Sequence, residues 1–75
     1  MINKTVDARG LNCPLPILRA KKALGDVPPG GALEILTSDK GAVADFEAFA
    51  RTTGNELIAS EQNGEVFRFV MRRLT

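Results

Sequence analysis

The alternation of apolar and polar positions predicts a short strand near the N-terminus and a second one in the middle of the chain. Val6 and Ala8 alternate with polar neighbours in the run Lys4–Ala8, the period-two pattern of a half-buried strand. Val27–Gly31 contains two prolines and two glycines, which are typical of a connection. The apolar run Ala32–Thr37 follows it and is predicted to be the second strand.

The C-terminal third of the chain predicts a β-hairpin. Asn63 and Gly64 separate two apolar runs, Leu57–Ser60 and Val66–Met71. An Asn-Gly pair between two such runs is the strongest short-range hairpin signal, because both residues tolerate the backbone angles of a tight turn. The last two strands are therefore expected to pair with each other.

Two segments have the composition and spacing of helices. Pro14–Leu24 is rich in good helix formers and is followed by Gly25. Ala42–Thr53 is the clearest amphipathic segment, and Gly54 follows it at the usual place for a helix-ending glycine. At about 100° per residue, one side of this second helix carries its apolar residues and one threonine: Ala42, Val43, Phe46, Phe49, Ala50 and Thr53.

The elements run β-α-β-α-β-β in one domain, residues 1–75. Right-handed crossovers that wind in the same sense place both helices on one face of a single sheet. The predicted fold is an α/β (α+β) two-layer sandwich, with two helices on one face of a four-stranded mixed sheet. The aromatic residues and one methionine are expected to meet between the layers: Phe46, Phe49, Phe67, Phe69 and Met71.

Composition narrows the function classes. The 75 residues carry a net charge of +1, which provides no general field for nucleic acid or an anionic membrane. No apolar run is long enough to span a membrane and no secretion signal is visible, so a cytoplasmic protein is expected. We also expect a monomer. The chain has no histidine and a single cysteine, Cys13. A catalytic triad, a Cys-His pair, an internal disulfide and a common zinc site are thereby excluded within one chain, and no metal or cofactor is predicted.

Cys13 is the candidate reactive residue. Pro14 follows it and suits the first position of a helix, which predicts that Cys13 is the N-cap, exposed and near the positive end of the helix dipole. The alternative is a small buried residue. Pro14 and Pro16 stiffen this turn, but they also remove two N–H donors, so the thiol pKa is expected only modestly below the usual value of about 8.5.

One side of the first helix is a candidate docking surface. Leu15 is expected to be exposed, bordered by Arg19 and Lys22, whereas the other side of the helix is assigned to the core by Ile17, Ala20 and Leu24. Lys21 fits neither side well, so either it extends its stem along apolar surface or the helix register is slightly shifted. Leu15 would enter an apolar pocket of a partner protein while Arg19 and Lys22 meet an acidic rim.

The run Asp7-Ala8-Arg9-Gly10-Leu11-Asn12-Cys13-Pro14-Leu15-Pro16 resembles the N-terminal signature of the TusA-like (SirA-like) sulfur carrier proteins. The resemblance extends over nearly the whole chain, and it implies the same β-α-β-α-β-β fold. It also implies that Cys13 accepts sulfane sulfur as a persulfide from a cysteine desulfurase or a rhodanese-type donor and relays it to an acceptor protein. Many members carry His where this chain has Asn55. The receiving pathway is left open among tRNA thiolation, molybdenum-cofactor enzymes, sulfur oxidation and selenium metabolism.

Residues around Cys13 are expected to support the loop. Asp7 and Arg9 form either a structural ion pair or a pair that orients the loop, and Gly10 is expected to adopt a backbone conformation that a Cβ would resist. Persulfide transfer is thiolate attack on a sulfane sulfur and needs no internal base, metal or second cysteine. The sequence thus favours a sulfurtransferase-type carrier over a self-contained enzyme.

Two other functions remain open at this stage. A regulatory or nucleic-acid-binding module would use the basic residues of the first helix and the last strand, namely Arg19, Lys21, Lys22, Arg72 and Arg73, but no aromatic stacking motif accompanies them. A thiol oxidoreductase working with glutathione is disfavoured because a second cysteine is missing.

Overall fold

The computed structural model describes residues 2–74 and contains four strands and two helices in the predicted order. The elements are β1 (Ile2–Ala8), α1 (Leu15–Leu24), β2 (Ala32–Thr37), α2 (Ala42–Thr53), β3 (Glu56–Asn63) and β4 (Val66–Arg72).

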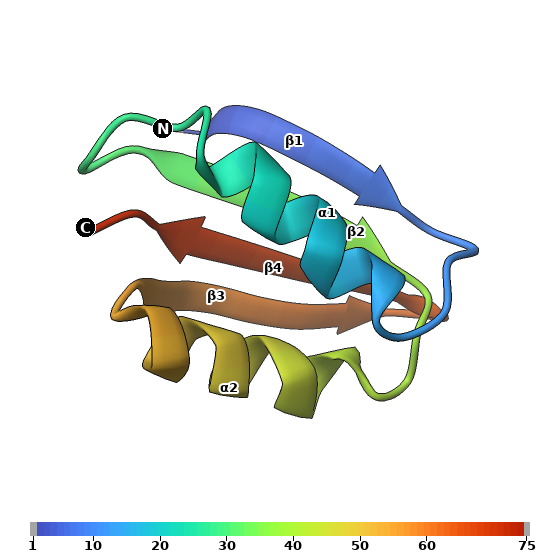
Figure 1. Ribbon diagram of the computed structural model, residues 1–75. Helices are drawn as coiled ribbons and strands as arrows, with labels where there is room; N and C mark the ends of the chain where they lie inside the picture. The colour runs from blue at the N-terminus through green and yellow to red at the C-terminus, as the bar shows by residue number, and fades with distance from the viewer. Residues whose placement is uncertain (1, 75) are drawn as a thin grey trace.

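The four strands form one mixed sheet in the order β1-β2-β4-β3. β1 and β2 are parallel, and β4 lies antiparallel between β2 and β3. Both helices cover the same face, with α1 packed on β1 and β2 and α2 packed on β3 and β4 (Figure 1). The predicted α+β two-layer sandwich is confirmed. Its consequence for function is that the loops after the parallel strands β1 and β2 lie at one end of the molecule, where α1 and α2 begin.

The core lies between the sheet and the two helices. Phe46 of α2 is fully buried and stacks on Phe69 of β4, with ring centroids 4.7 Å apart. Phe67 and Met71 are buried on the same side of β4, as expected. Phe49 differs from the expectation, because it is only partly buried and packs against the core from its edge. An aromatic side chain at this edge is therefore available to line a surface groove.

Some element boundaries differ from the sequence prediction. β1 begins at Ile2, two residues earlier than predicted, because the polar residue Asn3 helps to join it to β2: the Ala32 N–H donates to Asn3 Oδ1 at 2.9 Å. In the hairpin, Asn63 pairs with Val66, so the two turn residues are Gly64 and Glu65. Gly64 has a φ of 63°, and a glycine at the first turn position suits such a two-residue connection.

The sheet face without helices is stabilised by polar side chains that cross all four strands. Thr5 of β1 donates to Glu34 of β2 at 3.0 Å, and Glu34 binds Arg68 of β4. Arg68 in turn binds Glu61 of β3 at 2.7 Å. The polar side chains of the open face therefore bind one another across the sheet. Cys13 and the exposed residues of α1 lie outside this network.

Candidate functional site

Cys13 lies in the loop between β1 and α1, at the end of the molecule where both helices begin (Figure 1). Its thiol is exposed. The preceding loop is fixed to the next one along the sheet, because the Gly10 N–H donates to Ser38 Oγ at 2.9 Å. Since Ser38 follows β2, the cysteine loop and the loop that leads into α2 are held together.

The structure corrects the expected role of Cys13 as the N-cap of the first helix. The helix begins at Leu15 rather than Pro14, and Pro14 occupies the N-cap position. The Leu15 N–H donates to the Asn12 carbonyl at 2.8 Å and is therefore not available to the sulfur. The Cys13–Pro14 peptide bond is cis. Because a tight turn precedes the helix, Cys13 lies one residue outside it and the predicted stabilisation of a thiolate is weakened.

Two carboxylates lie beside the sulfur. The Cys13 Sγ and a carboxylate oxygen each of Asp39 and Asp45 all lie within 4.8 Å of one another. A hydrogen bond to Asp45 raises the pKa of the Cys13 thiol above its usual value, with desolvation and the negative charges of Asp45 and Asp39 acting in the same direction. The expected modest lowering of this pKa is therefore wrong in direction. The two nearby anions, which the sequence analysis did not connect with Cys13, are the reason.

A shallow groove of about 320 Å³ begins at the thiol and runs between the two helices. Pro14 and Ile17 line it from the side of α1, and Asp45 and Phe49 line it from α2. Ile17, assigned to the core by its position on the helix, is only partly buried for this reason. The sulfur thus borders an apolar strip that contains one negative charge.

The residues expected to support the loop make defined contacts. Arg9 Nε and Nη2 each donate to the Asp7 carboxylate at 2.8 Å, and this ion pair lowers the pKa of Asp7 to about 2. Gly10 has a φ of 81°, in the left-handed region that favours glycine. Pro16 lies in the first turn of α1 and is buried. Asp7 and Arg9 thereby connect the end of β1 to the start of the cysteine loop.

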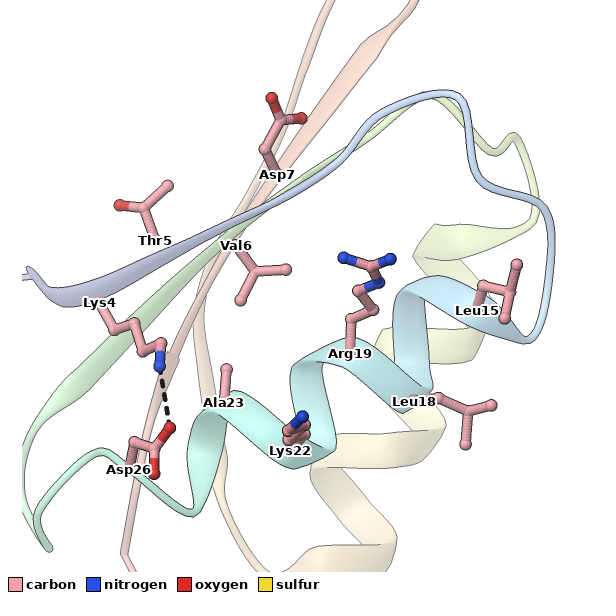
Figure 2. Close-up of a pocket in the computed structure, with 10 residues that line it drawn as sticks. All are labelled: Lys4, Thr5, Val6, Asp7, Leu15, Leu18, Arg19, Lys22, Ala23 and Asp26. Atoms are coloured by element: carbon pink, nitrogen blue, oxygen red, sulfur yellow. Dashed lines mark hydrogen bonds and ion pairs between the residues drawn. The ribbon is translucent and has the colours of Figure 1, made fainter.

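The outer side of α1 carries the predicted docking residues. Leu15 is 46% exposed and Leu18 is 53% exposed. Arg19 and Lys22 are also exposed and have no ion-pair partner within residues 2–74. Together with the edge of β1, the four residues border an open groove of about 670 Å³ (Figure 2). Figure 2 shows Leu15 and Leu18 pointing away from the sheet, with Arg19 over the groove. We call Leu15, Leu18, Arg19 and Lys22 the α1 surface.

Asn55, Arg72 at the end of β4 and Arg73 just after it are engaged at the opposite end of α2 from Cys13. Asn55 accepts a hydrogen bond from the Leu74 N–H at 2.8 Å. Arg73 donates to the Val27 carbonyl at 2.6 Å, and Arg72 pairs with Glu56 at 3.4 Å. α2 has 12 residues and is therefore about 18 Å long, so Asn55 lies far from the thiol.

Among residues 2–74, the cluster of Cys13, Asp39 and Asp45 is the one place where three potential metal ligands come together. It combines one soft sulfur with two hard carboxylates, a donor set that differs from the four-ligand sites of structural zinc. Within the same residues, neither helix has the length and apolar character needed to cross a membrane.

The whole described sheet and both helices match known proteins. Residues 4–73 match the family described as Sulfurtransferase TusA. The chain belongs to the TusA family. The sulfur carrier protein TusA of Allochromatium vinosum is 49% identical over 71 residues, which cover 95% of this chain and 93% of that protein. A candidate sulfur carrier protein of Neisseria meningitidis serogroup A is 55% identical, with 96% of this chain and 97% of that protein covered. A SirA-like protein of Desulfitobacterium hafniense has the same fold, with a TM-score of 0.76, 27% identity and coverage of 96% and 99%.

These matches confirm the resemblance read from the sequence. The structure of this TusA-family chain also adds site residues that were not predicted from the sequence. Asp39, in the loop after β2, and Asp45, in the first turn of α2, both lie beside the thiol, although neither is among the site residues predicted from the sequence. Leu18 was not included in the docking surface. The parallel pairing of β1 and β2 is the signal that would have placed Asp39 near Cys13, since loops after parallel neighbours lie at one edge of a sheet.

Proposed function

We propose that this TusA-family protein is a sulfur carrier that holds sulfane sulfur as a persulfide on Cys13 and relays it to an acceptor protein. The observation that carries the proposal is an exposed thiol in the Cys-Pro-Leu-Pro run at the free end of the sandwich, in a chain with no other cysteine. The family match and the carrier names of two relatives support it.

The chemistry requires no group that the chain lacks. The Cys13 sulfur attacks the outer sulfur of a donor persulfide, a new S–S bond forms, and the donor's own S–S bond breaks. The electron pair of the broken bond stays on the donor cysteine, which takes up the proton that Cys13 loses. No external oxidant or reductant is consumed. In the second half of the cycle an acceptor thiolate removes the same sulfur atom and regenerates Cys13.

Partner proteins must therefore supply and receive the sulfur. We propose a cysteine desulfurase or a rhodanese-type protein as the donor, and a cytoplasmic setting in which thiols stay reduced. The α1 surface is the proposed docking site, because it begins two residues after the thiol and combines exposed leucines with cations that form no ion pair within residues 2–74. A single exposed cysteine per chain is sufficient for the cycle, so we propose that a monomer is the working unit.

The residues around Cys13 have supporting roles in this proposal. Asp7 and Arg9 tie the start of the loop together, and Gly10 supplies the left-handed backbone conformation that turns the chain toward Cys13. Pro14 and Pro16 restrict the backbone between the thiol and the helix. These contacts would keep the sulfur at a fixed place on the surface and leave it open to a partner.

The nucleic-acid-binding alternative receives no support. Arg73 donates to backbone carbonyls at the end of α1, and Arg72 pairs with Glu56, so two of its five basic residues have roles within the fold. The remaining three lie on α1 without an aromatic residue for base stacking.

A sulfur-loading experiment tests the proposal. The protein is incubated with a cysteine desulfurase and cysteine, and its mass is measured before and after reduction. We expect the mass of one sulfur atom to be gained and then lost on reduction, with Cys13→Ser as the matched variant that gains none. Loading of the Ser variant, or no loading of the parent chain, would overturn the carrier function. Turnover with glutathione instead would establish the oxidoreductase.

A further inference from the structure

The acidic pair of Asp39 and Asp45 faces the thiol without a compensating cation. Neither carboxylate forms an ion pair within residues 2–74, where every lysine or arginine that forms an ion pair binds another acid. The groove at the sulfur is otherwise lined by uncharged side chains. Two negative charges close to a sulfur oppose its conversion to a thiolate, because the product would be a third negative charge in the same place.

Asp39 is held in place by its own loop. Its N–H donates to Thr37 Oγ1 at 3.1 Å, and the Gly41 N–H donates to its Oδ1 at 3.1 Å. Its second oxygen, Oδ2, is shielded from solvent and accepts no hydrogen bond from residues 2–74. Because this oxygen has no other donor, it can accept a hydrogen bond from the Cys13 S–H. If it does not, it still keeps a negative charge close to the sulfur.

Asp45 is fixed by the first turn of α2, where its N–H donates to the Gly41 carbonyl at 3.2 Å. Asp45 also lines the groove at the thiol, whereas Glu47 on the same helix is fully on the exposed side. The helix thus presents one acid to Cys13 and one to solvent. This arrangement provides a built-in comparison between two negative charges on α2.

The other charged groups near the loop do not offset the pair. Arg9, on the cysteine loop itself, is bound to Asp7 through two hydrogen bonds. Arg19 and Lys22 of α1 lie along the separate groove between α1 and β1. Lys40, next to Asp39 in the chain, is exposed and lines a different groove with residues of the β3–β4 hairpin. The charged groups that act on Cys13 are therefore Asp45 from α2 and Asp39 from the loop between β2 and α2.

We propose that Asp45, backed by Asp39, is a positioning residue that keeps Cys13 as a latent thiol in the free protein. The S–H donates to the acidic pair, and the thiolate becomes available only in a small fraction of molecules at neutral pH. A carrier in this state resists alkylation and adventitious oxidation between rounds of transfer, since the thiolate and not the thiol is the nucleophile. The latency is a property of the free chain, whereas its benefit for sulfur relay rests on the proposed carrier function.

The test measures the rate of alkylation of Cys13 by iodoacetamide, a neutral reagent, from pH 6 to pH 10. Asp45→Asn and Asp39→Asn should each lower the midpoint of the pH profile, and the double variant should lower it most. A tenfold gain in thiolate fraction is partly offset by a roughly threefold loss in the reactivity of the less basic thiolate. The alkylation rate at pH 7 should therefore rise about threefold for each tenfold gain in thiolate fraction. Asn retains an oxygen that can accept from the Gly41 N–H, so the Asp39 variant keeps its loop contact.

Two control variants separate the local effect from general charge and from damage to the fold. Glu47→Gln removes one negative charge from the exposed side of the same helix and should leave the midpoint unchanged. Asp45→Glu keeps the charge at the groove and should restore a midpoint near that of the parent. A midpoint that stays fixed in Asp45→Asn, or that moves equally in Glu47→Gln, would overturn the proposal.

The outcome is independent of the carrier experiment. Alkylation requires no sulfur donor. If the pH profiles of alkylation are unchanged in the variants, the latent thiol is refuted and the proposed persulfide loading is unaffected. Conversely, if the pH profiles shift in the variants but the parent chain never loads sulfur, the latent thiol is supported and the carrier function is refuted. In a chain that does load sulfur, we expect Asp45→Asn to extend loading to lower pH, because the thiolate then forms more readily.

Discussion

Truncation of both exposed leucines of the α1 surface should reduce sulfur transfer while leaving the fold intact. Leu15 and Leu18 are 46% and 53% exposed, so together they leave about one whole leucine side chain of apolar surface in solvent. Burial of one leucine side chain is worth about 1.5–3 kcal/mol. If a partner covers both, Leu15→Ala with Leu18→Ala should lower transfer efficiency by roughly 10-fold to 100-fold, since about 1.4 kcal/mol corresponds to a factor of ten.

The assay is the rate of persulfide loading from a cysteine desulfurase at low carrier concentration, where docking limits the rate, together with urea unfolding. Because each leucine is about half-buried, each truncation should cost about 1 kcal/mol of stability, against the 2–5 kcal/mol expected for buried Leu24→Ala. Ile58→Ala is the matched control, since Ile58 is 44% exposed but lies on β3, away from the α1 surface. Equal loading rates in the double variant and the parent, or an equal loss in Ile58→Ala, would refute the docking surface.

Three further predictions concern charge and packing. Arg73→Ala should lower the free energy of unfolding in urea by about 1–2 kcal/mol, because its guanidinium loses its hydrogen bonds to backbone carbonyls at the end of α1 and beyond. Arg72→Ala breaks an exposed ion pair and should cost less than about 1 kcal/mol. The bond to Arg9 lowers the pKa of Asp7 from 3.8 to about 2. The contribution of this ion pair to stability is therefore complete above pH 4 and lost as pH falls through 2. NMR titration of Asp7 should show the low midpoint, and Asp7→Asn should flatten the pH dependence of stability over this range. Phe46→Ala should cost about 3–5 kcal/mol in urea unfolding, and a loss below 1 kcal/mol would contradict the stacked core.

The order of elements could be predicted from the sequence because local signals agreed with the tertiary structure. The amphipathic spacing in Ala42–Thr53 gave the bounds of α2 without error, and Gly54 ends this helix in the left-handed conformation. The strand Ala32–Thr37 was also predicted with its observed bounds. In both segments apolar positions have a regular period and the residues at the ends have strong conformational preferences.

The outer strands were harder to predict, because tertiary pairing determines their length. β3 extends to Asn63 through a polar stretch that is exposed yet hydrogen-bonded to β4. β1 likewise includes Ile2 and Asn3 because β2 pairs with its beginning. A polar stretch of an edge strand has no burial pattern that distinguishes it from a loop, so periodicity ends before the strand does.

The electrostatic environment of Cys13 could not be predicted from its own loop. The residues next to Cys13 in the chain indicate a stabilised thiolate at a helix end, but the turn closed by Asn12 and Leu15 displaces the sulfur from that end. The carboxylates that act on the sulfur come from residues 26 and 32 positions later. A pKa depends on every charge within a few ångströms, so a local motif can identify a reactive residue without fixing its protonation state.

The topology itself contains the missing information. β1 and β2 are parallel neighbours, and a right-handed crossover through α1 requires the loops after both strands to lie at the same edge of the sheet. Cys13 follows β1, Asp39 follows β2, and Asp45 lies within the first turn of the helix that starts from that loop. Once the two strands are predicted to be parallel, the meeting of thiol and acids is a consequence of chain connectivity. The same connectivity places the acidic pair of Asp39 and Asp45 beside the sulfur and leaves the cations of the α1 surface, the proposed docking site, along a separate groove.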